Sequence, residues 1–249
     1  MDKSILVRQL WLAAVLLTRL PLPHLPEGAF AQGPRAVWAY PLVGLGVGAT
    51  GAVVGCLGIW VGISTWAAAV LALGVMTLLT GAMHEDGLAD LFDGFWGGFS
   101  PARRLEIMRD SQIGTYGVLA LVLMSVVKIS ALAVLLDTAP LAIGAAAALS
   151  RGVMPALMHA LPHARADGLS HSVGRPDLTT ASLSIVIGAA ISLLCVGLTG
   201  VAMTVIAVTA ATVIGVLANR KIGGQTGDVL GAAQQLSEAA ILLTCTAML

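Results

Sequence analysis

Charged residues are scarce in this sequence: Asp, Glu, Lys and Arg together make up 10% of it. A soluble globular domain has about 25% charged and about 45–50% apolar residues. Here the hydrophobic share is 57% and the mean hydropathy is +0.93, which excludes an ordinary soluble domain. Acidic and basic residues are equal in number, 13 of each, so a broad basic surface for nucleic acid is excluded as well.

Cysteines and aromatic residues are also few. The three cysteines, Cys56, Cys195 and Cys245, lie alone in apolar runs, so neither a zinc cluster nor a disulfide framework is expected. Glycine, by contrast, reaches 29 residues, which suits helices that pack closely in lipid. We expect an all-α, polytopic integral membrane helix bundle of about six to eight transmembrane helices, with residues 1–249 forming one domain. Whether it forms a homo-oligomer stays open.

Apolar stretches of about 20 residues, the length that spans a bilayer, recur along the chain. The expected spans are Trp38 to Ile63, Thr65 to Gly81, Thr115 to Leu136, Pro140 to Leu161, Ala181 to Thr199, and Gly200 to Ala218. Two further segments are marginal. Ile5 to Leu20 is interpreted as a retained amphipathic or short anchoring helix, and Ala239 to Leu249 gains length if its helix starts near Gly231.

Polar residues gather in four connections between these stretches, whereas the other three connections are short and have no Lys or Arg. The four are Pro21 to Val37, His84 to Gly114, Pro162 to Thr180, and Asn219 to Asp228. Strict alternation of the spans places all four on one side of the bilayer, and their basic residues make that side cytoplasmic by the positive-inside rule. We therefore expect a cytoplasmic (inner) membrane protein whose polar loops face the cytoplasm.

The most informative segment runs from His84 to Gly94 and holds four of the 13 acidic residues. Asp86, Asp90 and Asp93 follow an i, i+4, i+7 spacing, which puts them on one face of a helix. Three carboxylates on one face repel each other, and desolvation near a membrane adds to the cost. A divalent cation relieves both, and oxygen ligands favour magnesium, manganese or calcium. The spacing predicts a metal site; a solvated acidic helix is the alternative.

Two further polar segments carry side chains suited to phosphate. Arg109 can donate two parallel hydrogen bonds to a phosphate, while Asp110 and Ser111 either cap the next helix or join the metal site. The Gly-rich segment around Thr226 and Asp228 allows an anion to approach the backbone closely, although it lacks the Walker A spacing. These residues are candidates for binding a phosphorylated substrate.

Lys128 and Arg151 lie inside predicted spans, where charges usually face a bundle interior or a wet cavity. We count both as candidates for binding substrate. A carboxylate-bound metal beside arginines indicates phosphoryl transfer, because the metal neutralises charge on the phosphate oxygens and a spare carboxylate can take a proton. The residues alone do not identify the substrates.

The polar segments resemble those of a known family. Residues 84–94, HEDGLADLFDG, are similar to the signature of the cobalamin synthases, or adenosylcobinamide-GDP ribazoletransferases. Three other blocks match the family's pattern in order: TRLPLP at 18–23, MRDSQIGTYG at 108–117 and GGQTGDVLGA at 223–232. The similarity extends over nearly the whole chain.

This resemblance implies transfer of the phosphoryl-linked adenosylcobinamide from GDP to α-ribazole or its 5′-phosphate. GMP leaves, adenosylcobalamin or its phosphate forms, and magnesium is required. By this matching Asp86, Asp90 and Asp93 are metal ligands, and Asp90 or Asp93 is also a candidate base. His84 is counted with the catalytic residues, and Arg109, Asp110 and Asp228 belong to the surrounding shell.

Two positions depart from the family's pattern. Glu85 stands where the family commonly has an uncharged residue, and Gln234 and Gln235 occupy a place where at least one Glu is expected, although Glu238 still matches. No role is assigned to Glu85.

Two other functions share part of this pattern. A CDP-alcohol phosphotransferase acting on lipid headgroups has a similar Asp pattern but an Ala-Arg pair where this chain has Ala89 and Asp90. A metal-ion transporter would carry its acids near the middle of spans or in interrupted helices, whereas here they cluster at the end of one.

Overall fold

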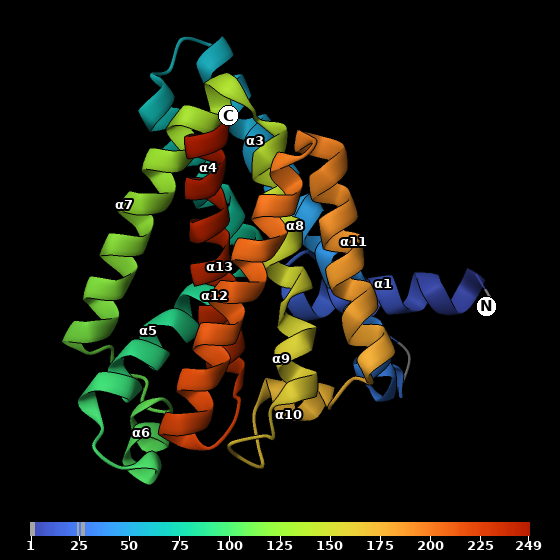
Figure 1. Cartoon of the computed structure of the whole chain (residues 1–249), viewed down its shortest axis with the longest axis vertical. Helices are drawn as coiled ribbons and strands as arrows, with labels where there is room; N and C mark the ends of the chain where they lie inside the picture. Colours follow the sequence, from blue (N-terminus) through green and yellow to red (C-terminus); the bar gives the residue numbers. More distant parts are fainter. Residues whose placement is uncertain (1–2, 24, 26–27) are drawn as a thin grey trace.

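The computed structural model describes residues 3–23, 25 and 28–249. Apart from one isolated bridge between His163 and Gln225, these residues form only helices and loops. Most of the long helices run side by side along the longest axis of the molecule (Figure 1). They are α3 (Tyr40–Trp60), α4 (Thr65–Thr80), α7 (Thr115–Thr138), α8 (Leu141–Gly152), α9 (Met154–Ala160), α11 (Leu178–Val196), α12 (Thr199–Ile222) and α13 (Gly227–Met248).

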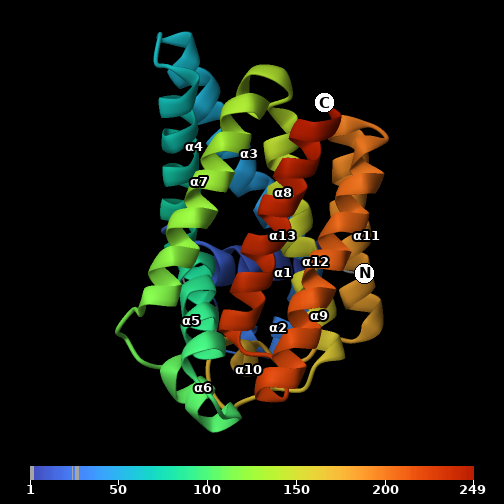
Figure 2. The ribbon, with the colours of Figure 1, turned by 60° about the vertical axis from the view of Figure 1, so that its left-hand side comes forward.

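The remaining helices lie across the middle of this bundle or at its lower end as drawn in Figures 1 and 2. They are α1 (Lys3–Leu17), η1 (Ala29–Gln32), α2 (Gly33–Ala36), η2 (Val37–Ala39), α5 (Met83–Gly97), α6 (Pro101–Ile107) and α10 (Leu169–Val173).

Five helical stretches of the described residues are long and apolar enough to cross a membrane, by length and composition. They are Ala29–Trp60, Thr115–Thr138, Leu141–Ala160, Leu178–Val196 and Thr199–Ile222. Helices α4 and α5 pass the same test only as a pair, and this pair is bent by 89°. The expected all-α polytopic bundle is confirmed, with five such helices, or six if the bent pair counts as one span.

Helix α4 corresponds to the expected span Thr65 to Gly81, and the chain bends sharply directly after it. Two successive residues in the left-handed region, Gly81 (φ 64°) and Ala82 (φ 57°), end α4 after 16 residues. Their backbone N–H groups donate to the carbonyls of Leu78 and Thr77, the geometry that closes a helix. Because the chain turns here, α5 runs across the bundle and carries the Asp-rich segment there.

The lengths of the first and last helices show what the two marginal apolar segments form. Helix α1 has 15 residues, about 22 Å at the helical rise and too short for a hydrocarbon core of about 30 Å. It lies across the bundle (Figure 1), in agreement with the short-anchor interpretation. Helix α13 begins at Gly227 and has 22 residues, so the longer version of the last segment is confirmed.

The polar connections meet at the end of the bundle that is drawn at the bottom of Figures 1 and 2, where α2, α6, α10 and the turn from α12 to α13 lie. The short connections α3–α4, α7–α8 and α11–α12 lie at the opposite end. This arrangement agrees with the expected common side. Positions 24, 26 and 27 of the first connection lie outside the described residues.

Small residues let the central helices approach closely. A Cβ on Gly44 of α3 would meet the carbonyl oxygen of Ala147 in α8, and one on Gly48 would lie 2.6 Å from the Ala147 Cβ. Every residue from Ala142 to Gly152 is buried. Such backbone-to-backbone packing is typical of helices in membranes, and it makes α8 the core on which the functional end is built.

Candidate active site

The Asp-rich helix α5 crosses the first turns of α13. Gly87 and Gly231 lie at this crossing. A Cβ on Gly87 would come within 3.0 Å of the Asp228 backbone, and one on Gly231 within 3.2 Å of the His84 Cα. Because neither position has a side chain, the two backbones come close together. The crossing therefore brings Asp228, from a different polar connection, beside the acidic face of α5.

Asp86, Asp90 and Asp228 form the acidic part of the site. Burial, with the negative charges of Asp228, Asp86 and Asp93, raises the pKa of Asp90 to about 7. Burial also raises the pKa of Asp228, although Arg165 and the Thr226 hydroxyl act in the opposite direction. The carboxylates therefore repel each other, and Asp90 and Asp228 are partly buried whereas Asp86 is exposed. A bound cation relieves such repulsion.

Arg165 is a site residue that the sequence analysis did not single out. Its Nη2 lies 3.4 Å from Oδ2 of Asp228 and its Nε 3.4 Å from Oδ1 of Asp167. Its Nη1 is buried and has no hydrogen-bond partner among the described residues. The only sequence signal for Arg165 was its place in a polar connection, because the contact with Asp228 joins segments more than sixty residues apart.

Arg109 reaches the same region from the connection between α6 and α7. Its Nη2 lies 2.9 Å from both carboxylate oxygens of Asp167, and both side chains are more than half exposed. Asp167 thus lies between Arg109 and Arg165. The structure places Arg109 at the rim of the site, held to the loop that carries Arg165.

Asp93 faces the start of α7. Its Oδ2 accepts a hydrogen bond from the Gly114 N–H at 2.7 Å and its Oδ1 one from the Gly117 N–H at 2.9 Å. A carboxylate there satisfies N–H groups that have no intrahelical partner and complements the helix dipole. A metal bound by Asp93 would have to share these oxygens with α7.

The two residues expected as possible caps of α7 do not cap it. Helix α7 follows Gly114 without a cap from a neighbouring side chain, so capping by Asp110 or Ser111 is wrong. Oδ1 of Asp110 accepts instead from the Gln112 N–H at 3.0 Å, and Ser111 is exposed. Thr226 does cap its helix: its hydroxyl oxygen accepts from the Val229 N–H and also donates to Asp228.

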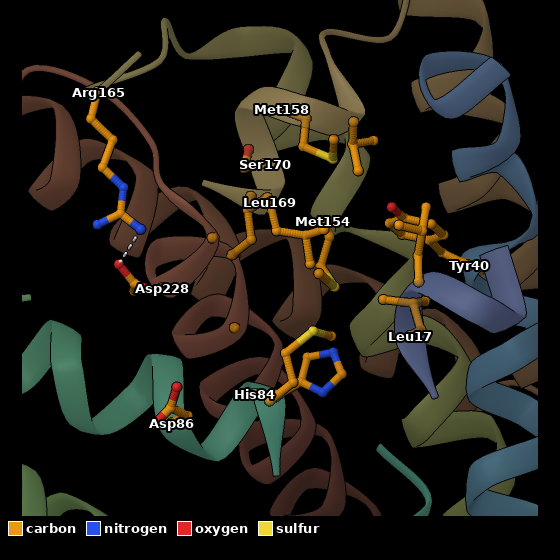
Figure 3. Close-up of a pocket in the computed structure, with 16 residues that line it drawn as sticks. Leu17, Tyr40, His84, Asp86, Met154, Met158, Arg165, Leu169, Ser170 and Asp228 are labelled. Carbon is orange, nitrogen blue, oxygen red and sulfur yellow. Dashed lines mark ion pairs between the residues drawn. The ribbon is translucent and has the colours of Figure 1, made fainter. Parts of the chain in front are cut away.

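A cavity of about 150 Å³ opens beside the acidic residues. Figure 3 shows Asp86, Asp228 and Arg165 on one side of it, and Leu17 and Tyr40 on the other. Most of the remaining lining residues are methionine and leucine: Met83, Met154, Met158, Leu16, Leu169 and Leu230. The cavity thus has a charged end and an apolar end.

His84 lies between these two ends in Figure 3. It is fully buried, and within the described chain neither of its ring nitrogens has a hydrogen-bond partner. Burial, with the positive charges of Arg151 and Lys128, lowers the pKa of His84 well below its usual value. The imidazole thus has an N–H donor that no group of the described chain uses.

Lys128 and Arg151 are not brought to this cavity. Both are 2% exposed inside the bundle. The Lys128 Nζ donates to Oε1 of Gln235 at 3.0 Å and lies 3.3 Å from Oε2 of Glu238. The Arg151 Nη1 donates to the Ala147 carbonyl at 3.0 Å. Lys128 is thus paired within the protein, as interior charges in a bundle usually are. Arg151 bonds one carbonyl, and its buried Nε has no hydrogen-bond partner in the described chain.

The two departures from the family's pattern meet in this same cluster. Gln235 Nε2 donates to Oε1 of Glu85 at 3.0 Å, and Gln234 Nε2 donates to Oε2 of Glu238 at 2.5 Å. Lys128 and Arg151 are therefore accompanied by two carboxylates, Glu85 and Glu238. We call Glu85, Lys128, Arg151, Gln234, Gln235 and Glu238 the interior charge cluster.

The fit of a metal ion depends on the acidic residues alone. In the part of the chain that the structure describes, no three His, Cys, Asp or Glu residues are arranged as a metal-binding group. Asp86, Asp90 and Asp228 are nevertheless hard oxygen donors whose mutual repulsion Arg165 offsets only in part, which suits magnesium in chemistry.

Comparison with known proteins bears on the same residues. A family profile described as cobalamin-5-phosphate synthase matches residues 9–246, a range that includes all of the polar segments above. No solved structure matches the chain.

Several curated proteins are similar over almost their whole length and carry the name adenosylcobinamide-GDP ribazoletransferase. One from Mesorhizobium japonicum is 45% identical over 247 residues, covering 96% of this chain and 92% of the relative. One from Azorhizobium caulinodans is 46% identical over 238 residues, covering 91% and 90%. One from Bradyrhizobium diazoefficiens is 42% identical over 245 residues, covering 97% and 94%. With a profile that matches nearly all of its residues, this chain belongs to the cobalamin-5-phosphate synthase family.

Proposed function

We propose that this protein transfers the adenosylcobinamide-phosphate group from adenosylcobinamide-GDP to α-ribazole or its 5′-phosphate, with release of GMP. The observation that carries the proposal is the similarity along the whole chain to proteins named adenosylcobinamide-GDP ribazoletransferase. The site supports it independently, because the crossing of α5 and α13 gathers carboxylates and an arginine at one cavity.

Magnesium is proposed as the cofactor, held by Asp86, Asp90 and Asp228. When bound, it would neutralise negative charge on the oxygens of the diphosphate. Asp93 is left out of this set, because its two oxygens already accept hydrogen bonds from α7. Lys128 and Arg151 are left out of the substrate-binding set, because they belong to the interior charge cluster.

The remaining groups bind and orient the diphosphate. Arg165 has a buried Nη1 without a hydrogen-bond partner in the described chain, and guanidinium groups pair well with phosphate oxygens. Helix α13 begins at Gly227, which lines the cavity, so the positive end of its dipole also faces the substrate.

The reaction exchanges one phosphorus–oxygen bond for another. A hydroxyl oxygen of the ribazole forms a bond to the phosphorus next to the cobinamide. The bond from that phosphorus to the bridging oxygen breaks, and GMP leaves with the electron pair. One of the three carboxylates accepts the proton of the hydroxyl, the general-base role that buried acids fill in enzymes.

The cytoplasmic face of an inner membrane is proposed as the location of the site. The basic residues of the functional end lie in α2, in α6, in the last turn of α12 and in the loops beside α6 and α10: Arg35, Arg103, Lys221, Arg109 and Arg165. The positive-inside rule places such an end in the cytoplasm. A headgroup phosphotransferase of the CDP-alcohol type and a metal-ion transporter gain no support from the comparisons.

The test is GMP release by purified protein in lipid nanodiscs supplied with adenosylcobinamide-GDP, α-ribazole and magnesium. We expect the wild type to release GMP, chelation of magnesium to stop it, and Asp86→Asn, Asp90→Asn and Asp228→Asn each to slow it at least about 100-fold. Asp137→Asn, the same change at the opposite end of the bundle, is the control and should retain activity. A wild type that forms no GMP would overturn the proposed function, and normal turnover in an Asn variant would remove that residue from the metal set.

A further inference from the structure

We propose that the apolar end of the cavity is the subsite for the base of the ribazole nucleoside, with His84 donating a hydrogen bond to the free ring nitrogen of that base. This inference rests on the proposed function and adds the position of the acceptor within the same site. It makes His84 a substrate-binding residue for the aromatic half of the acceptor.

The lining of this end suits an apolar, flat ring. Leu17 and Tyr40 form the wall opposite the charges, and Met154 and Met158 approach from α9 (Figure 3). Methionine side chains adapt to planar ligands and make favourable sulfur contacts with aromatic rings. The base of ribazole is a dimethylbenzimidazole, whose two fused rings and two methyl groups are largely apolar.

The volume of the cavity limits which part of a substrate can enter it. Pockets that enclose a drug-sized ligand measure about 300–1,000 Å³, and this one measures about 150 Å³. It therefore accommodates one ring system and excludes a corrinoid. The bulky cobinamide half has to stay outside the cavity, and only its diphosphate can approach the charged end.

His84 supplies a fully buried polar group at this end that has no hydrogen-bond partner in the described chain. A fully buried imidazole without any hydrogen-bond partner is unfavourable, and here both ring nitrogens are in this condition. Once joined to its ribose, dimethylbenzimidazole keeps one ring nitrogen with a free lone pair. One N–H donor therefore meets one acceptor, and the remaining surface of the base is apolar.

Guanine, the other base among the substrates, does not fit this end. Its carbonyl, amino group and ring N–H would each need a partner. Apart from His84, this end offers the single hydroxyl of Tyr40 among leucine and methionine side chains. A ribazole with its base at the apolar end also directs its ribose toward Asp86 and Asp228 on the opposite side. The attacking hydroxyl is thereby brought to the carboxylates that the reaction needs.

Calorimetric binding to the protein in nanodiscs, without adenosylcobinamide-GDP, tests this subsite. Two ligands are compared: α-ribazole, and the analogue in which a 5,6-dimethylindole replaces the base and removes only the free ring nitrogen. We expect wild type to bind α-ribazole about tenfold more tightly than the analogue, the value of one hydrogen bond. In His84→Leu this difference should vanish, whereas His159→Leu, a change outside the cavity lining, should keep it.

Equal affinity of the wild type for the two ligands overturns the subsite, and so does displacement of α-ribazole by guanosine. If His84→Leu does not fold, the comparison of the two ligands on the wild type still decides. Failure of the proposed function is a separate result: it shows as absent GMP release from a wild type that binds α-ribazole. Normal GMP release with no preference between the ligands rejects the subsite alone.

Discussion

Glu85 and Gln235 show how the interior of the bundle stays electrically balanced at the scale of single residues. The glutamine amide donates to the Glu85 carboxylate at 3.0 Å, and its carbonyl oxygen accepts from Lys128. The negative charge is on Glu85, and Gln235 links it to Lys128 through these two hydrogen bonds. Since Lys128 and Arg151 are both buried, each carboxylate in the cluster has a cation to compensate.

Because Glu85 and Gln235 are hydrogen-bonded to each other, we expect that the carboxylate can be moved from position 85 to position 235. Glu85→Gln leaves two buried cations with one acid, and we expect it to lower the free energy of unfolding by about 1–3 kcal/mol. Gln235→Glu added to Glu85→Gln restores the charge beside Lys128 and keeps the hydrogen bond with donor and acceptor exchanged. Chemical unfolding in mixed micelles measures both.

The control for this exchange is Glu106→Gln, which removes an exposed acid and should leave the unfolding free energy nearly unchanged. A double variant that is no more stable than Glu85→Gln would show that a carboxylate at position 235 does not compensate the charge of Lys128.

Sequence patterns identified these residues only in part. Lys128 and Arg151 stood out because charge is rare inside an apolar run, but the partners of Lys128 lie 107 and 110 positions away. Asp93 likewise follows the spacing of Asp86 and Asp90, yet its partners are backbone groups of the next long helix. Helical spacing predicts which residues share a face and not what that face meets.

At the scale of elements, the site depends on how closely α5 and α13 approach. Gly87→Ala would put a Cβ 3.0 Å from the backbone of Asp228, and backbone cannot move aside as a flexible side chain does. We expect the crossing to open and turnover to fall at least about tenfold, because small displacements of catalytic groups are costly. GMP release and thermal unfolding are measured together.

Gly74→Ala in α4 is the matched control, because nothing lies within 4 Å of a Cβ placed there and alanine favours a helix interior. It should keep both activity and stability. Unchanged GMP release in Gly87→Ala would show that the crossing does not position the acids.

Element boundaries were predictable where they depended on apolar length. The spans from α7 to α12 agree with their expected ranges within a few residues. The bend after α4 was not predictable from sequence, since it depends on Ala82 in a conformation that alanine seldom adopts. The start of α13 was obscured because polar residues interrupt its apolar run, and these residues pair inside the bundle.

At the scale of the whole molecule, the polar connections and the acidic cavity share one end of the bundle. Alternation of spans and the distribution of arginines predicted this common end from sequence alone. The cavity itself was not predictable, because its walls come from α1, α3, α5, α9, α10 and α13. Only the packed bundle brings these segments together.

The common end leads to a prediction about membrane orientation. In a chain whose three cysteines are replaced by alanine, Phe99→Cys and Val61→Cys introduce single thiols at opposite ends, at positions 96% and 64% exposed. A membrane-impermeant maleimide applied to intact spheroplasts should label Val61→Cys, and should label Phe99→Cys only after the membrane is opened. The reason is that phosphorylated nucleotides do not cross a bilayer, so a site that uses a GDP-linked substrate has to face the compartment that supplies it. The reverse labelling pattern would place the acidic cavity outside the cell and would contradict both the positive-inside assignment and the proposed supply of substrate.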